Sequence, residues 1–215
     1  MHKFCVVDMS SFYLDIIKDR LYCEKSEGKL RLSAQSAIYE ILNTMVRLIA
    51  PILAFTSNEI WLSMPHGKNE TESHIMLCDM PAAKADRFFD EEKTQRWNLV
   101  SALRDDVNKA LELARADKTI GKPLEASVTL YLDEEAKERF GKISDMPLST
   151  IFIVSEVNVV YGKGEGNRGE SFDGVTVKIA PCTAPKCVRC WTHSHTVGES
   201  TEHPELCSRC VSVLS

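Results

Sequence analysis

Three stretches of the chain place apolar residues at three- and four-residue spacings, which is the pattern of an amphipathic helix. The first runs from Phe4 to Cys23, the second begins near Leu32, and the third extends from Trp97 to Ala114. An apolar stripe on each of three helices joined by loops predicts that the stripes meet as a core. This part of the chain is therefore expected to form a helical bundle.

Three local signals suggest where these helices begin and end. Pro51 should end or kink the second helix, because proline has no amide donor and restricts the residue before it. Thr56 and Glu59 fit a capping box that would open a short helix. Gly121 follows the third helical pattern and is a plausible stop signal.

From Glu125 onward the spacing of apolar residues changes to the alternation of a half-buried strand. Apolar and polar residues alternate in residues 126–132 and 175–179, which predicts two strands. Residues 151–161 are rich in β-branched side chains and predict a further strand, whereas residues 134–142 predict a short helix. The predicted fold class is therefore mainly α, a helical bundle followed by a small α+β module and a four-cysteine zinc knuckle. The expected domains are residues 1–121, 122–181 and 182–215.

The cysteines are concentrated at the end of the chain. Five of the eight, Cys182, Cys187, Cys190, Cys207 and Cys210, lie in the last 34 residues. Four of them form two Cys-x-x-Cys pairs separated by 16 residues, a spacing typical of zinc ribbons and knuckles. Four protein ligands leave no open position for water, so one structural Zn²⁺ ion is expected, with Cys182 outside the site. The alternatives are four unrelated thiols or two redox pairs.

No catalytic constellation is visible elsewhere in the chain. Gly164, Gly166 and Gly169 match a dinucleotide-binding pattern, but that pattern needs a following helix and residues 171–179 predict a strand. A flexible hairpin loop is the better interpretation of these glycines. No histidine pair has the spacing of a hydrolytic zinc site, and no glycine-flanked serine forms a nucleophile elbow.

The overall charge and hydropathy narrow the class of protein further. A formal charge of −5 argues against a general nucleic-acid binder, although it leaves room for one shaped RNA. No apolar run approaches the roughly 20 residues that span a bilayer, and nothing at the start resembles a signal peptide. A cytoplasmic protein without membrane contact is the expectation.

The chain carries four landmark segments in order, residues 8–22, 47–61 and 107–126 and the two cysteine pairs with Trp191. Together they resemble the carboxy-terminal part of bacterial isoleucyl-tRNA synthetases, an anticodon-binding domain followed by a zinc-binding tail. The helical segments alone would also suit valyl- or leucyl-tRNA synthetases. The terminal zinc motif with its tryptophan favours the isoleucine enzyme.

This resemblance implies an RNA partner for this chain and places catalysis in another part of the parent enzyme. The partner is the anticodon region of isoleucine tRNA, with the parent's catalytic domain in the same polypeptide and a monomeric state. The synthetic site of that family carries His-x-Gly-His and Lys-Met-Ser-Lys-Ser motifs, and neither occurs in these 215 residues. The expected function is tRNA binding by a fragment that lacks the catalytic and editing domains and catalyses nothing by itself.

Local charge suggests how such a fragment would hold RNA. Residues 96–122 carry six basic and four acidic side chains, whereas residues 182–215 carry three of each. Because four thiolates on a divalent ion add a net −2, the zinc-binding end must contribute shape and stacking instead. Trp191, Arg189 and Arg209 are the candidate platforms for tRNA bases. The alternative for Trp191 is a cap over the small core around the metal.

Two other functions remain open from the sequence. One is a stand-alone zinc-ribbon module that binds another protein. The other is an iron-binding electron carrier of the rubredoxin type, because four cysteines also suit iron.

Overall fold

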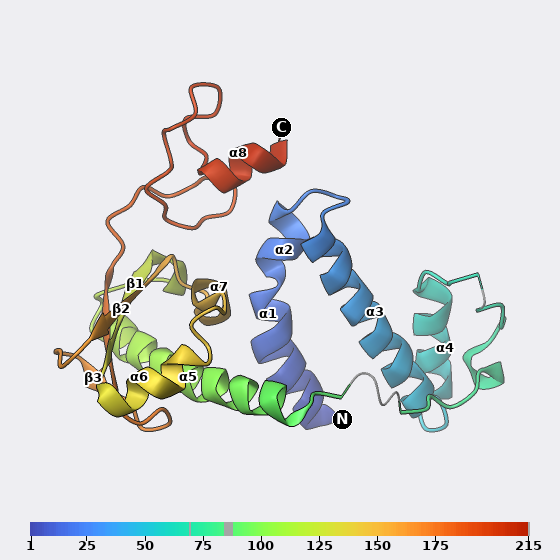
Figure 1. Cartoon of the computed structure of the whole chain (residues 1–215). Helices are drawn as coiled ribbons and strands as arrows, with labels where there is room; N and C mark the ends of the chain where they lie inside the picture. The colour runs from blue at the N-terminus through green and yellow to red at the C-terminus, as the bar shows by residue number, and fades with distance from the viewer. Residues whose placement is uncertain (69, 84–87, 215) are drawn as a thin grey trace. The chain divides into compact units, whose positions relative to one another are not determined.

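The computed structural model describes residues 1–68, 70–83 and 88–214, and the chain divides into two compact units (Figure 1). One unit is Met1–Cys23 together with Phe89–Ser215, and the other is Glu24–Phe88. The predicted domain boundaries after residues 121 and 181 stay a prediction. The predicted fold class is confirmed: helices dominate, a small sheet follows, and four cysteines cluster near the end.

The first unit opens with the helical stretch predicted for residues 4–23. It consists of the π-helical segment η1 (Phe4–Tyr13), the short helix α1 (Leu14–Ile16) and α2 (Lys18–Cys23). The Phe12 ring meets the Trp97 ring edge-on, with centroids 5.5 Å apart. This contact attaches the start of the chain to the long helix that follows much later in the sequence.

The long helix α5 (Glu91–Ala116) extends beyond both ends of the apolar pattern from Trp97 to Ala114, but it ends before the predicted stop at Gly121. Asp90 is its N-cap, and the carboxylate accepts the Lys93 amide at 2.8 Å. The helix stops because Lys118 adopts a left-handed conformation with φ +59°. Gly121 is therefore not the stop signal that was predicted.

Gly121 instead belongs to the turn that leads into the sheet. Its amide donates at 2.9 Å to Oε2 of Glu125, the last residue of the 3₁₀ turn η4 (Pro123–Glu125). The amide of Lys122 donates to the same oxygen at 3.1 Å. These hydrogen bonds hold the pKa of the exposed Glu125 carboxyl below its usual value.

The sheet has four strands in the order β2-β1-β4-β3. The predicted strand at 126–132 is confirmed as β1 (Ala126–Leu132), and that at 175–179 lies within β4 (Val175–Pro181). β1 pairs in parallel with β2 (Glu156–Tyr161) and antiparallel with β4, whose other neighbour is the short β3 (Asn167–Arg168). Alternate residues of β1 are buried, as its sequence pattern predicts.

Two helices connect the parallel strands, and one of them corrects the prediction for residues 151–161. The predicted helix at 134–142 is confirmed as α6 (Glu134–Gly141). However, the start of the predicted strand is the end of helix α7 (Leu148–Phe152), which Ile153 terminates with φ +58°. Burial at helical spacing outweighed the β-branched composition here. Three apolar residues of α7 are buried: Leu148, Ile151 and Phe152.

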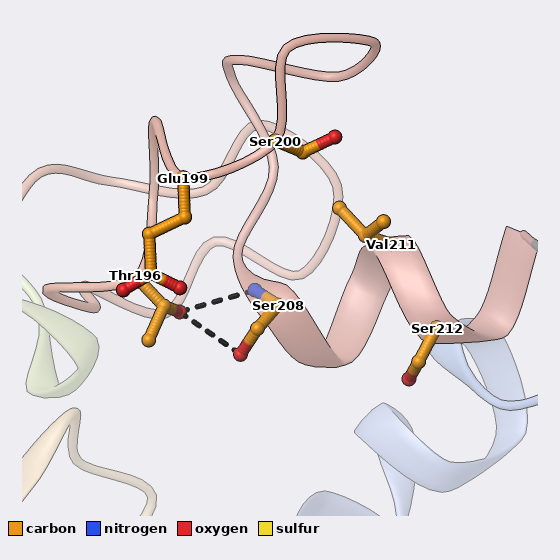
Figure 2. A pocket seen from close by; sticks show the side chains of 6 residues that line it. All are labelled: Thr196, Glu199, Ser200, Ser208, Val211 and Ser212. Carbon is orange, nitrogen blue, oxygen red and sulfur yellow. Dashed lines mark hydrogen bonds between the residues drawn. The ribbon is translucent and has the colours of Figure 1, made fainter.

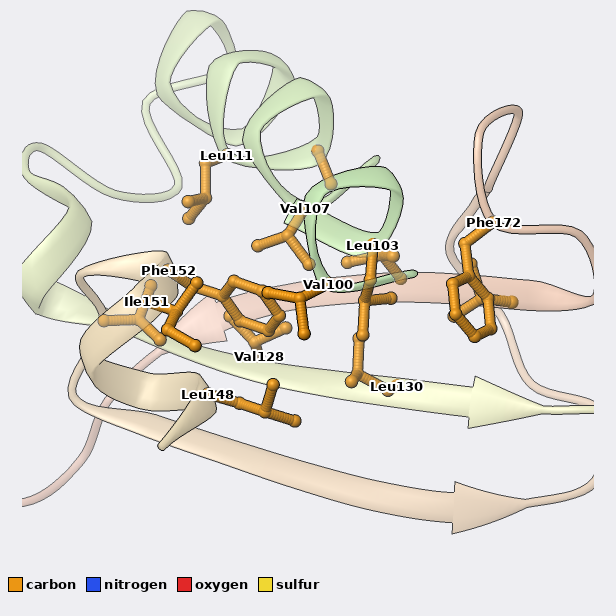
Figure 3. Close-up of a cluster of buried hydrophobic side chains, with 14 of the residues drawn as sticks. Val100, Leu103, Val107, Leu111, Val128, Leu130, Leu148, Ile151, Phe152 and Phe172 are labelled. Atoms are coloured by element: carbon orange, nitrogen blue, oxygen red, sulfur yellow. The ribbon is translucent and has the colours of Figure 1, made fainter. Parts of the chain in front are cut away.

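The core of this unit forms where α5 packs against the sheet (Figure 3). The apolar stripe of α5 thus covers strands and α7. Full burial of one such side chain is worth roughly 1.5–3 kcal/mol, so this core is the main source of stability for the unit. The labelled residues that meet are Val100, Leu103, Val107 and Leu111 of α5, Val128 and Leu130 of β1, and Leu148, Ile151, Phe152 and Phe172.

The glycine-rich loop is anchored by an acid on α5. Asp106 is only 5% exposed, and its carboxylate accepts the backbone amides of Glu170, Ser171 and Phe172 at 2.8–3.2 Å. A Cβ on Gly169 would come within 2.6 Å of Asp106 Oδ2, so glycine is required for this close approach. A strand and not a helix follows, as predicted, so the loop lacks the helix amino terminus on which a dinucleotide phosphate would lie.

The second unit contains the helices α3 (Lys29–Ile49) and α4 (Ala54–Ser63) and the short 3₁₀ turn η2 (Ile75–Leu77). These three elements contact one another. The predicted capping box is wrong, because α4 begins two residues before Thr56 and Leu53 occupies the N-cap position. A core of five buried residues holds this unit: Val46, Ala50, Trp61, Met64 and Ile75. Among the described residues, no helix is both long and apolar enough to cross a membrane.

Candidate metal centre and nucleic-acid interface

The four cysteines predicted as ligands come together in the structure. Cys187, Cys190, Cys207 and Cys210 are all buried, and their sulfur atoms lie within 4.8 Å of one another. The Sγ atoms of Cys190 and Cys207 are 3.8 Å apart, and each cysteine is a free thiol. A tetrahedral zinc ion with bonds of about 2.3 Å requires sulfur atoms separated by about 3.8 Å. The donor set and its spacing therefore fit one zinc ion.

Backbone hydrogen bonds build the two turns and join them. In the first turn the Trp191 amide donates to the Cys187 carbonyl at 2.9 Å, and the Cys187 amide donates to the Thr192 carbonyl at 3.0 Å. The second turn runs into helix α8 (Ser208–Leu214), and its Cys207 amide donates to Cys187 Sγ at 3.4 Å. This last contact aims a backbone donor at a sulfur, which favours the thiolate that a metal needs.

A threonine fixes the start of α8, which carries the fourth cysteine. Thr196 Oγ1 accepts the Ser208 amide at 3.0 Å and lies 3.2 Å from the Ser208 hydroxyl (Figure 2). A small hollow beside this contact is lined by Thr196, Glu199, Ser200, Ser208, Val211 and Ser212 (Figure 2). It offers hydroxyl groups and one carboxylate, a set that does not suit an anionic RNA backbone.

The thiols of the cluster are poorly solvated, which makes a cation favourable. Burial raises the pKa of Cys207 and, more strongly, that of Cys210. Burial also opposes ionisation of Cys187, but backbone amides of Cys190, Cys207 and Arg189 outweigh it and lower its pKa to about 6. Zinc stabilises the buried thiolates by direct coordination and offsets part of their charge, so the cluster accommodates it as a structural ion.

Trp191 lies at the surface of the first cysteine turn. Its side chain is 63% exposed and its backbone has φ +64°, a conformation that L-residues rarely adopt. Lys186 Nζ lies 5.9 Å from the ring centroid. The buried core around the sulfurs contains Leu206 and Cys23 and not Trp191. An exposed ring of this kind favours a stacking platform over a cap on the metal core.

The two arginines expected as RNA platforms have protein partners on α2. Arg189 Nη1 donates to the Cys23 carbonyl at 2.7 Å and to Cys210 Sγ at 3.7 Å. Arg209 forms a two-pronged ion pair with Asp19, in which Nη2 donates to Oδ1 at 2.8 Å. Their role as tRNA contacts stays a prediction.

A groove of about 1230 Å³ lies between α2, the η4 turn and the first cysteine turn. Trp191 and the 78% exposed Tyr22 both line it, together with Lys18, Lys122 and Lys186. Its lining holds five basic and three acidic side chains, a net +2 on a chain of formal charge −5. Lys122 is one of the basic residues counted in residues 96–122, whereas sequence reasoning missed Tyr22, Lys18 and Lys186, because only the folded chain brings segments this distant together.

The basic residues of α5 are less available than their sequence suggested. Three of the six in residues 96–122 have protein partners. Arg96 pairs with Asp145, Arg104 donates to the Ile151 carbonyl, and Lys109 pairs with Glu170. The groove is therefore the better-defined basic surface in the part of the chain that the structure describes.

Comparison with known families gives two matches on this chain. Residues 1–130 match the family described as "Anticodon-binding domain of tRNA ligase". Residues 185–213 match the "Zinc finger found in FPG and IleRS", and this range contains all four clustered cysteines. One structural zinc ion is therefore the cofactor of this chain, as predicted.

The similarity to known proteins extends over the whole of this chain. The isoleucine–tRNA ligase of Syntrophotalea carbinolica is 43% identical over 216 residues, and that of Thermoanaerobacter sp. is 45% identical over 217 residues. The match covers at least 99% of this chain but 23% of each relative, so the chain spans under a quarter of their length. The resemblance to isoleucyl-tRNA synthetases is confirmed. With the family match extending over more than half of its residues, this chain belongs to the anticodon-binding domain family of tRNA ligases and carries the FPG/IleRS zinc finger behind it.

Proposed function

We propose that this chain is the tRNA-binding part of an isoleucine–tRNA ligase and that it holds the anticodon region of isoleucine tRNA. One observation carries the proposal: an exposed tryptophan on a metal-organised turn lines a net-positive groove in a chain of the anticodon-binding family. Unpaired bases of an RNA loop stack on exposed aromatic rings, and lysines beside them neutralise the phosphates.

The residues divide into two roles in this proposal. Cys187, Cys190, Cys207 and Cys210 hold the zinc ion, which fixes the turn that carries Trp191. Trp191 offers its ring to a base, and Lys186 lies over the same ring. The zinc ion has no open position for substrate once four sulfurs bind it, so its contribution is structural.

We assign the synthetic reaction, the formation of isoleucyl-adenylate, to another part of the parent protein. The chain has neither the His-x-Gly-His nor the Lys-Met-Ser-Lys-Ser motif, so we propose that it acts in cis to a catalytic domain and forms no isoleucyl-adenylate alone. It is expected to be a monomer. Isoleucine-dependent pyrophosphate exchange by the purified chain above background would contradict this part of the proposal.

A gel-shift titration tests the binding function. The zinc-loaded chain should shift isoleucine tRNA at a lower protein concentration than an unrelated tRNA of the same length. The matched control is the same protein stripped of zinc by a chelator, which should lose this preference because Trp191 is no longer held in place. Equal affinity for both tRNAs would favour a protein-binding zinc-ribbon module instead.

A further inference from the structure

The two cysteine turns share a feature that zinc binding does not explain. Each has the sequence Cys-x-Arg-Cys, and each arginine reaches the same short helix, α2. Arg189 contacts the end of α2, and Arg209 contacts it one turn earlier. The partners in these pairs are 166 and 190 positions apart in sequence.

Helix α2 offers hydrogen-bond acceptors to both arginines. Asp19 and Cys23 are four residues apart, so their side chains lie on one face of the helix. Cys23 is the last residue of α2, and its carbonyl is one of those left without a partner inside the helix. A guanidinium at this end is favourable, because the carboxyl end of a helix attracts positive charge.

The contact also has an apolar part. The Cys23 side chain is buried, and it packs in one cluster with the four metal-site cysteines and Leu206. Its sulfur lies 3.9 Å from the Arg189 carbonyl oxygen. Arg189 itself bridges the two parts, because the same Nη1 donates to the Cys23 carbonyl and to Cys210 Sγ.

We infer that Arg189 and Arg209 form a metal-dependent clamp on α2, so that loading the zinc ion orders the last turn of this helix. Both arginines sit between two ligands of the site, and each can reach α2 only when its cysteine turn is closed. The zinc module, residues 182–214, has too few apolar residues to close these turns without the metal. α2 ends where the second compact unit begins at Glu24, so the clamp fixes the segment that leads into that unit.

Because of thermodynamic linkage, a substitution on α2 can test the clamp through its effect on zinc affinity. If zinc favours docking of α2, then docking must favour zinc by the same factor. Asp19→Ala leaves every zinc ligand in place, yet it should weaken the zinc affinity of the chain. We expect a loss of about threefold, the size of a partly exposed ion pair.

The experiment measures zinc affinity by competition with a chromogenic chelator on the full chain, without RNA. Arg139→Ala is the matched control, because it removes an arginine–aspartate pair with Asp173 that does not touch α2. Hydrogen exchange of the amides in residues 18–23 should also accelerate when the metal is stripped. Because no tRNA is involved, the outcome is independent of the proposed function.

Exchanging the charges of Asp19 and Arg209 distinguishes loss of their ion pair from general damage to the fold. The double variant Asp19→Arg with Arg209→Asp should recover zinc affinity relative to Asp19→Arg alone. The inference is overturned if Asp19→Ala leaves zinc affinity unchanged, or if metal removal leaves the exchange of residues 18–23 unchanged.

Discussion

Replacing Cys190 with serine should release the zinc ion and unfold the zinc module, residues 182–214, while the α5–sheet core stays folded. Serine provides no thiolate, so one corner of the tetrahedron is lost. Among the described residues of the module, Leu206 packs beside the sulfurs as a buried aliphatic side chain, with Val197 and Val211 partly buried. A segment of this size depends on its metal, and structural zinc contributes on the order of 10 kcal/mol of folding free energy in small fingers.

The measurement is zinc content together with hydrogen exchange resolved along the chain. Cys182→Ser is the matched control, because Cys182 is a half-buried thiol outside the cluster and should keep both zinc and protection. Cys207→Ser should behave as Cys190→Ser does. Full retention of zinc or of amide protection in the module by Cys190→Ser would contradict the metal assignment.

Replacing Trp191 with alanine should lower the affinity for isoleucine tRNA by about 1–3 kcal/mol, roughly five- to 150-fold, while zinc stays bound. The ring is 63% exposed and lies outside the buried core, so its loss should leave the cluster closed. The measurement is tRNA affinity and zinc content on the same protein preparations. Trp191→Phe should retain part of the affinity, since a smaller aromatic face remains.

The backbone of Trp191 provides a second, sharper control. With φ +64°, this position suits glycine better than any L-residue, so Trp191→Gly should relieve strain as it removes the ring. Equal losses of tRNA affinity in Trp191→Ala and Trp191→Gly would assign the effect to the ring. Loss of zinc in both variants would identify the ring as a cap on the metal core, and retained zinc with unchanged affinity would defeat both interpretations.

The sequence predicted best where one local rule decides the structure. β1 alternates because one face is buried, and the spacing of the two Cys-x-x-Cys pairs identified the metal cluster without further help. The rule failed where two signals competed. Residues 151–152 have β-branched and aromatic side chains typical of strands, yet α7 buries them at helical spacing against α5.

The groove could not be predicted, because it depends on contacts between distant segments. Nothing near Tyr22 in the sequence signals that it shares a groove with Trp191. In the same way, the sequence indicates no protein partner for Arg189 or Arg209, and only the folded chain shows that both contact α2. Residue type and spacing identify the metal ligands, whereas the partners of exposed charges follow only from tertiary packing.

An exchange of anticodon loops tests the central claim most directly. The zinc-loaded chain is titrated with isoleucine tRNA, with an unrelated tRNA, and with the two chimaeras in which only the anticodon loops are exchanged. If the chain binds the anticodon region, tight binding should follow the isoleucine loop onto the unrelated tRNA and disappear from isoleucine tRNA that has lost it. A preference that stays with the body of isoleucine tRNA, or no preference among the four RNAs, would contradict the account.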